Sequence, residues 1–202
     1  MSLRERKKAE TRQRIQDEAM RLFLERGYDA TTVEEIAAAA GVSHMTFFRH
    51  YPSKDDVVAM DAYDPLLAEL IRARPAAEHP VERVRATVLA GLEAVYAGDR
   101  DTILARAQLI GSTPALRARA LDNQRATEAL FASALGDEDA LEVQVLAAAC
   151  VAALVTAVNR WAEHPEQAEL PELVDRCFAA LRPSCPNSST GASPRCARRS
   201  AR

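Results

Sequence analysis

The apolar residues at the start of the chain recur with the spacing of short, packed helices. The first helix is expected over residues 4–26. Its apolar side chains, such as Ile15, Ala19 and Phe23, repeat every fourth position and would lie on one side. Gly27 follows directly, and glycine readily takes the left-handed conformation that ends many helices. The pattern therefore predicts one amphipathic helix that stops at residue 26.

Two shorter helices are expected next, joined by a tight turn. The first spans residues 33–40 and begins after an N-cap at Thr32. Gly41 starts the turn, and Ser43 caps the second helix, which spans residues 44–51. Two short helices around such a turn are typical of a helix-turn-helix.

The rest of the chain has the pattern of longer helices. A fourth helix is expected from Ser53 to about Arg74, kinked at Pro65. Five more follow, separated by glycine and proline breaks, over residues 80–98, 99–111, 113–135, 138–163 and 168–181. Residues 183–202 are rich in Pro and Ser and almost lack large apolar residues, so we expect a disordered tail there.

Composition agrees with an all-α fold. Apolar residues make up 48% of the 202 residues, and only 7 are glycine. Ala and Leu dominate, and both cost little in a helix interior. We therefore predict an all-α fold of about nine helices. The expected domains are a helix-turn-helix domain at 1–54, a helical body at 55–182, and the tail at 183–202.

Charge is distributed unevenly along the chain. The net charge of −3 alone argues against a nucleic-acid-binding protein. Residues 1–54, however, hold 10 Lys and Arg against 8 Asp and Glu, whereas residues 55–181 hold 11 against 21. A mildly basic N-terminal domain on an acidic body suits local contact with phosphates, so DNA contacts are sought in the N-terminal domain.

Several other classes of protein lack support in the sequence. There is no stretch of about 18 uncharged apolar residues and no apolar run behind the charged N-terminus, so we expect a cytoplasmic protein with no membrane contact. The four cysteines show no C-x-x-C pair, which argues against a metal site. No Glu-x-x-His pair or Ser/Cys–His grouping stands out either, so we expect no enzyme activity, catalytic site or cofactor.

The second helix of the helix-turn-helix divides into an inner and an outer side. At about 100° per residue, Phe47 and Tyr51 point inwards. Met45 and Arg49 point the opposite way, with polar residues on the flanks. A recognition helix needs such an apolar back, exposed front and polar flanks. Arg49 can donate two hydrogen bonds to a guanine, a contact worth about 1–3 kcal/mol of discrimination.

A likeness to a known family is carried by residues 21–58, RLFLERGYDATTVEEIAAAAGVSHMTFFRHYPSKDDVV. This segment resembles the DNA-binding domain of the TetR family over nearly its whole length. The resemblance implies that one group of residues lies near phosphates and another faces bases. The first group is Thr32, Thr46, Phe48, His50 and Lys54, and the second is Ser43, His44, Met45 and Arg49. The family usually has Tyr where Phe48 stands, so one hydroxyl contact would be lost.

The basic residues ahead of this segment have two open interpretations. Six Lys and Arg side chains lie between residues 4 and 14. They either contact DNA phosphates or form a solvated helix face.

A homodimer is expected because two N-terminal domains on a two-fold axis can read a palindrome. The candidate surface lies in residues 139–161 and 170–181, where alanines permit close helix approach and valines supply apolar area. The expected interface residues are Val145, Ala148, Ala152, Val155 and Leu173. The alternative is that these residues form ordinary core within one chain.

The remaining helices are expected to enclose a pocket for an amphipathic small molecule. Its candidate lining residues, each of which also fits plain core, are Tyr96, Gln108, Leu109, Phe131, Thr156, Asn159 and Trp161. The C-terminal part is similar to TetR regulators of the mycofactocin-system type. That resemblance implies an acyl-CoA-like ligand, whose phosphates would meet one of Arg106, Arg117, Arg119 or Arg125.

The sequence thus predicts a ligand-responsive repressor that binds a double-stranded DNA operator as a homodimer. Two alternatives stay open. One is an activator of the same family, and the other is a helical protein-interaction module that no longer reads DNA.

Overall fold

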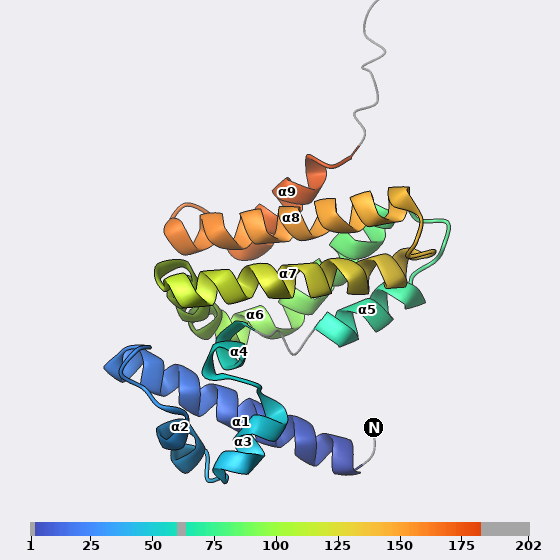
Figure 1. The fold of residues 1–202 in the computed structure, drawn as a ribbon. Helices are drawn as coiled ribbons and strands as arrows, with labels where there is room; N and C mark the ends of the chain where they lie inside the picture. Colours follow the sequence, from blue (N-terminus) through green and yellow to red (C-terminus); the bar gives the residue numbers. More distant parts are fainter. Residues whose placement is uncertain (1–2, 60–63, 183–202) are drawn as a thin grey trace, which may run out of the picture.

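The computed structural model describes residues 3–59 and 64–182 of the chain. Within these ranges it has nine helices and no strand, in two stacked parts (Figure 1). The head consists of α1 (Leu3–Arg26), α2 (Val33–Ala39), α3 (His44–His50) and α4 (Lys54–Ala59). The body consists of α5 (Asp64–Ala73), α6 (Pro80–Ser112), α7 (Pro114–Leu135), α8 (Leu141–Glu163) and α9 (Leu170–Ala179). The all-α prediction is confirmed, and the expected tail at 183–202 lies outside the described residues.

The predicted single helix from Ser53 to Arg74 is described as two helices, α4 and α5, and residues 60–63 between them lie outside the described residues. The second helix begins at Asp64, directly before Pro65. Proline lacks the N–H that a helix interior needs but fits the first turn, where that N–H has no partner. Pro65 therefore stands in the first turn of α5.

The predicted break between residues 98 and 99 is wrong, because α6 runs without interruption from Pro80 to Ser112. Gly98 lies in its interior, where a glycine costs roughly 1 kcal/mol relative to alanine. α6 packs against α5, α7, α8 and α9 along its length. That burial of apolar surface outweighs the cost of one glycine.

Each part has its own apolar core. In the head, Ile15, Ile36 and Phe47 are fully buried. Leu116, from the start of α7, is fully buried in this same cluster, so the body contributes to the core of the head. The body core joins α5 to α9, and its largest buried side chains are Trp161, Phe131 and Phe178.

Arg83 ties two helix ends together inside the body. It is only 7% exposed, and its guanidinium donates to the carbonyl of Ile71 at 2.8 Å and to those of Ala134 and Leu135 at 3.3 and 3.2 Å. These carbonyls lie in the last turns of α5 and α7, where helix carbonyls lack intrahelical partners and a positive charge is favoured. Arg83 therefore stabilises the packing of α5, α6 and α7.

The apolar composition of α8 bears on two predictions, the absence of membrane contact and the dimer surface. By length and composition it could cross a membrane, with a mean hydropathy of 2.1 over 18 residues, of which 28% are buried. Core helices of soluble proteins have the same composition, and α8 packs against α6, α7 and α9. The low burial shows that much of its apolar surface is uncovered in one chain.

Candidate DNA-binding surface

α3 is held firmly against the head by its inner side. Phe47 is fully buried, and its ring lies 6.1 Å from that of Tyr51, which is also fully buried. The Tyr51 hydroxyl donates to the Arg12 carbonyl at 3.2 Å, which ties the end of α3 to α1. Gly41 takes a φ of 63° in the turn before α3, a conformation that suits glycine. These contacts fix the direction in which the other side of α3 points.

The other side of α3 carries large exposed side chains. Met45 is 82% exposed, the highest value among the exposed large apolar residues of the described chain, and Phe48 is 42% exposed. Arg49 is exposed beside them, and one of its guanidinium nitrogens lies 3.5 Å from the Thr46 hydroxyl. The His44 imidazole packs edge-on against Phe48, with ring centroids 4.7 Å apart. This face has the size and chemistry to contact base edges in a major groove.

The predicted capping hydroxyls serve the helix starts in the structure. Ser43 accepts a hydrogen bond from the Thr46 amide at 3.1 Å, and the two hydroxyls lie 2.9 Å apart. Thr32 and Glu35 form a capping box at the start of α2. Thr32 and Ser43 are exposed, so both remain within reach of a backbone phosphate beside the helix starts.

Lys54 makes hydrogen bonds within the head. Its ammonium donates to the carbonyls of Tyr28 at 3.0 Å and Thr31 at 3.2 Å, and it lies 4.2 Å from the centre of the Tyr28 ring. In this arrangement Lys54 joins α4 to the loop between α1 and α2. A phosphate contact would have to be made alongside these bonds.

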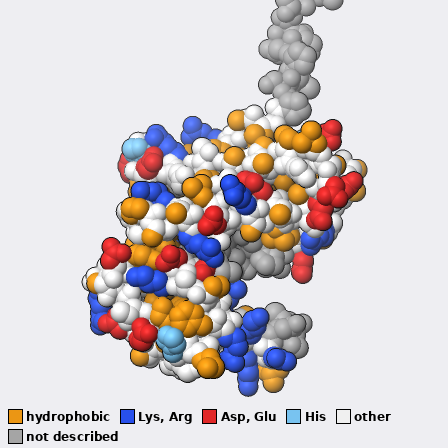
Figure 2. All heavy atoms as spheres, in the orientation of Figure 1, with side chains coloured by type: hydrophobic (Ala, Val, Ile, Leu, Met, Phe, Trp, Pro, Cys, Tyr) orange, Lys and Arg blue, Asp and Glu red, His pale blue; other side chains and the backbone are white. Residues whose placement is uncertain are grey.

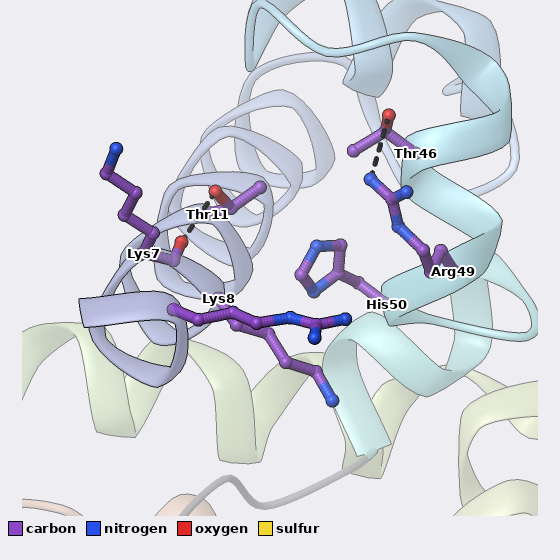
Figure 3. A pocket seen from close by; sticks show the side chains of 7 residues that line it. Lys7, Lys8, Thr11, Thr46, Arg49 and His50 are labelled. Carbon is purple, nitrogen blue, oxygen red and sulfur yellow. Dashed lines mark hydrogen bonds between the residues drawn. The ribbon is translucent and has the colours of Figure 1, made fainter. Parts of the chain in front are cut away.

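A basic hollow of about 430 Å³ lies between the first turns of α1 and the end of α3. Figure 3 shows His50 of α3 pointing towards α1, where Lys8 and Thr11 lie, while Arg49 turns towards Thr46 and the Lys7 side chain extends away from α3. The described residues that line the hollow are Arg4, Lys7, Lys8, Thr11, Thr46, Arg49 and His50. Figure 2 shows basic side chains gathered near the N-terminal end of α1.

The positive charges of this hollow affect the pKa of His50. Its pKa is lowered, first because the imidazole is partly buried and then because Arg49, Lys8 and Arg12 add positive charge nearby. Its Nδ1 atom is buried and has no hydrogen-bond partner among the described residues. The hollow therefore disfavours another positive charge and favours a negative one.

Three of the seven expected pocket residues share the body core. Trp161 and Phe131 are fully buried, and the Tyr96 ring lies 5.7 Å from that of Trp161. The Tyr96 hydroxyl donates to Glu169, which also accepts hydrogen bonds from Arg100. The indole Nε1 of Trp161 is buried without a partner among the described residues.

The other four expected pocket residues lie elsewhere. Thr156 and Asn159 are exposed on α8. Gln108 is exposed and donates to the Ala162 carbonyl at 3.1 Å. Leu109 packs against the core of the head. The structure therefore does not bring all seven residues around one cavity.

Four of the five expected dimer residues form a stripe on α8. Val145 is 58% exposed, Val155 is 38% exposed, and Ala152 between them is also exposed. Ala148 is half-buried on the same side. Leu173 is instead 8% exposed and packs within the body core of its own chain.

A set of contacts between head and body was not anticipated from the sequence. Asp56 on α4 is 1% exposed and accepts a hydrogen bond from Arg119 Nε on α7 at 2.7 Å. Arg106 Nε on α6 donates to the Val58 carbonyl on α4 at 2.7 Å. With the buried Leu116, these contacts attach α4 to α6 and α7. In the sequence, Asp55 and Asp56 at the start of α4 were the signal for these contacts. The helix dipole already explains acidic residues at that position, so the pair did not indicate a partner in the body.

The four arginines considered for ligand phosphates have different surroundings. Arg119 and Arg106 bind α4 as described, and Arg117 donates to the Gly111 carbonyl at 2.6 Å. Arg125 lines a second hollow of about 450 Å³ between α7 and the start of α8, beside Glu128, Glu138 and Asp139.

Comparison with known families identifies the chain. Residues 15–59 match the model of bacterial regulatory proteins of the tetR family, and residues 78–186, more than half of the chain, match the MftR C-terminal domain. The protein therefore belongs to the TetR family of transcriptional regulators. The predictions from resemblance of both segments are confirmed at the level of the family.

Two relatives, both named as transcriptional regulators or repressors, match parts of the chain. The chain is 33% identical to the transcriptional regulator TcmR of Streptomyces glaucescens over 148 residues, which cover 70% of this chain and 66% of TcmR. It is 30% identical to the transcriptional repressor KstR2 of Mycobacterium tuberculosis over 48% of this chain and 50% of that protein. The chain thus spans about two thirds and one half of these relatives.

A solved structure of a TetR repressor is also similar. FadR of Thermus thermophilus, in complex with lauroyl-CoA, is 28% identical to this chain with a TM-score of 0.53, covering 84% of this chain and 92% of that one.

Proposed function

We propose that the protein is a ligand-responsive repressor that reads a palindromic operator with the outer face of α3. The observation that carries this proposal is the division of α3 into a fully buried side at Phe47 and a side with Met45 82% exposed. Large apolar and basic side chains on a rigid, outward helix suit contact with base edges. The basic hollow next to this face supplies the phosphate contacts that hold a recognition helix in register.

Selection from a pool of random duplexes tests this proposal, because it requires no assumed operator sequence. The expected product is a palindrome whose half-sites are about 10 base pairs apart, one turn of DNA. The double variant Met45→Ala with Arg49→Ala should lose the selected preference. Arg21→Ala is the control, since Arg21 only forms exposed ion pairs with Glu18 and Glu25 within α1. Failure of the wild-type protein to enrich any sequence would overturn the proposal.

The homodimer is proposed through α8. Its stripe of Val145, Ala148, Ala152 and Val155 leaves apolar surface uncovered in one chain, and two such helices with α9 would form a four-helix bundle. Val145→Glu with Val155→Glu should give a monomer in analytical ultracentrifugation. Leu24→Glu, at a 58% exposed position on α1, is the control and should leave the dimer intact. A stripe variant that remained dimeric would refute this interface.

We propose an acyl-CoA-like effector for the body. Support comes from the match to the MftR C-terminal domain and from the similarity to the lauroyl-CoA complex of T. thermophilus FadR. Trp161 is the sole tryptophan of the chain and lies in the body core, so its fluorescence reports on that region alone. Lauroyl-CoA should change this fluorescence and release operator DNA, whereas free CoA and lauric acid should do so weakly. Tight binding of lauroyl-CoA without any change in operator affinity would refute the switch.

The route of this switch is proposed to run through α4. Asp56 and Val58 on α4 are bonded to Arg119 and Arg106 of the body, so a shift of α6 or α7 would move α4 and with it the head. A change in the separation of two heads would lower operator affinity. Typical allosteric coupling of about 1–3 kcal/mol would change occupancy 5–150-fold.

We infer a cytoplasmic protein with no enzyme activity, in which α8 packs against other protein. An activator that uses the same operator is the second candidate, because the geometry of α3 does not set the sign of control. Transcription in vitro from a promoter that contains the selected site distinguishes the two: a repressor lowers the yield, and an activator raises it.

A further inference from the structure

His44, the first residue of α3, contacts a carboxylate of α2. Its Nε2 atom lies 3.2 Å from Oε1 of Glu34. The two side chains are 57% and 71% exposed, so the contact adds little to the stability of the free protein. Among the described residues, His44 is the only partner of the Glu34 carboxylate. The contact therefore matters for what it does to the imidazole.

The imidazole of His44 is held from two sides. Phe48, one turn further along α3, packs edge-on against it, with ring centroids 4.7 Å apart. Glu34 lies in the first turn of α2, whose start is fixed by the capping box of Thr32 and Glu35. Its carboxylate contacts Nε2, and Nδ1 of His44 has no partner among the described residues. One ring nitrogen is thus engaged within the protein, and the other is available to a ligand.

The carboxylate determines which ring nitrogen carries the hydrogen of a neutral imidazole. Ionised carboxylates have acceptor atoms only, so Glu34 favours a hydrogen on Nε2 and disfavours a lone pair there. Since neutral imidazole has one N–H, Nδ1 of His44 then presents a lone pair, which accepts a hydrogen bond and does not donate one. The donors on base edges in a major groove are the amino groups of adenine and cytosine, whereas guanine and thymine present acceptors there.

We propose that Glu34 is a positioning residue for base recognition, which holds His44 so that Nδ1 accepts a hydrogen bond from the amino group of an adenine or a cytosine in each half-site. His44 stands at the N-terminal end of α3, and that end of a recognition helix contacts base edges. The inference rests on the proposed function, because it assumes that α3 lies in a major groove. It adds a residue of α2 to the determinants of the operator sequence and names the chemical group that is read at one base pair.

Base analogues test the inference atom by atom, at about pH 8, where imidazoles are ordinarily neutral. The sequences selected by the wild-type protein and by His44→Ala identify the base pair that depends on His44. In that pair, an analogue without the amino group, purine for adenine or 2-pyrimidinone for cytosine, should lower the affinity of the wild-type protein about 5-fold per half-site. The affinity of His44→Ala should hardly change. The 7-deaza analogue of the purine in the same pair removes the acceptor N7 and should leave the affinity of the wild-type protein unchanged.

Variants of Glu34 separate positioning from direct contact with the base. Glu34→Ala should lose the difference in affinity between the natural and the amino-free duplex. Glu34→Gln should retain most of it, because the amide oxygen still accepts from Nε2. The ratio of the two affinities is compared because loss of any carboxylate favours all DNA, and Glu25→Ala is the control for that charge, since Glu25 pairs with Arg21 on α1. The double variant Glu34→Ala with His44→Ala should behave as His44→Ala alone.

The outcomes separate this inference from the proposed function. It is overturned by a difference that Glu34→Ala leaves intact, by one that follows purine N7, or by identical selected sequences from the wild-type protein and His44→Ala. A difference that is lost in Glu34→Ala but kept in His44→Ala would show that Glu34 reads the base itself, which also overturns it. All these results leave the repressor proposal standing, because the wild-type protein still selects an operator. A wild-type pool with no enriched sequence overturns both.

Discussion

Neighbouring residues of α3 have different roles: one stabilises the fold of the head, and the other lies on the surface proposed to bind DNA. Phe47 and Phe48 are adjacent, yet the first is fully buried and the second is 42% exposed. Phe47→Ala should lower the free energy of unfolding of the head by about 3–5 kcal/mol, because it leaves a cavity in a small core. Phe48→Ala should change it by less than about 1 kcal/mol. Urea denaturation followed by circular dichroism measures both, and similar losses for the two variants would contradict the structure.

His50 should make DNA binding depend on pH. In the free protein its pKa is lowered by burial and by Arg49, Lys8 and Arg12, so the imidazole is neutral at pH 7. A phosphate in the hollow favours the charged form and raises the pKa, so binding takes up a proton. Affinity should therefore increase as pH falls from about 7 through the lowered pKa.

Anisotropy titrations between about pH 7.5 and 5.5 check this expectation. His50→Gln should lose most of the increase in affinity. His44→Gln, which removes an exposed imidazole of the same helix, should retain it. The interpretation fails if the pH response follows His44 and not His50.

At this scale the sequence predicted what depends on local spacing. Helical periodicity assigned Phe47 to the inside and Met45 to the outside, and the caps at Thr32 and Ser43 followed from neighbouring residues. The position of Lys54 could not be predicted in this way. Its ammonium binds carbonyls of residues 28 and 31, which the fold brings close across more than 20 residues of chain.

Among the helices, α1 to α3 were predicted within one residue at each end, because Gly27 follows α1 and the caps at Thr32 and Ser43 precede α2 and α3. The long helices of the body were harder to delimit. Gly98 looked like a break, but the packing of α6 on α7, α8 and α9 overrides a weak local preference. Pro65 looked like a kink, but it stands at the start of α5.

Arg83 gives the packing of these helices a specific test. Arg83→Met removes hydrogen bonds to the carbonyls of Ile71, Ala134 and Leu135 and leaves them buried. We expect a loss of roughly 3 kcal/mol in the free energy of unfolding of the body. Arg85→Met is the control: it breaks ion pairs with Glu82 and Asp175 near the surface, which should cost about 1 kcal/mol or less. Thermal denaturation that ranks the variants in the opposite order would contradict this role.

For the whole molecule, the connection between head and body decides whether a ligand can control DNA binding. The buried Asp56 accepts from Arg119 of the body through Oδ1, while its Oδ2 accepts from Ser53 of the head. Asp56→Asn should reduce the fold-change in operator affinity that lauroyl-CoA produces. Arg119→Gln should do the same, and the double variant should add little, because the two changes break one interaction. Strictly additive effects on the fold-change would show that the two residues act separately.

The sequence predicted less at this scale than at the others. It identified the apolar stripe on α8 but also assigned Leu173 to the dimer surface, and the structure buries Leu173 in the core of its own chain. The expected pocket residues have suitable chemistry, but packing places Thr156 and Asn159 at the surface of α8 and Leu109 against the head. Which apolar residues face a partner and which face the core depends on how the helices are rotated, and periodicity alone does not determine this.

The most direct test of the account is covalent capture of DNA by the outer face of α3. Met45, 82% exposed, is replaced by the photoreactive residue benzoylphenylalanine, and Leu24, 58% exposed on α1, is replaced in a second protein as the control. Irradiation with the selected duplex should give a protein–DNA adduct from position 45, with the reacted base inside a half-site, and little or none from position 24. Equal adduct from both positions, or none from position 45 while the duplex is bound, would contradict the claim that this face of α3 reads DNA.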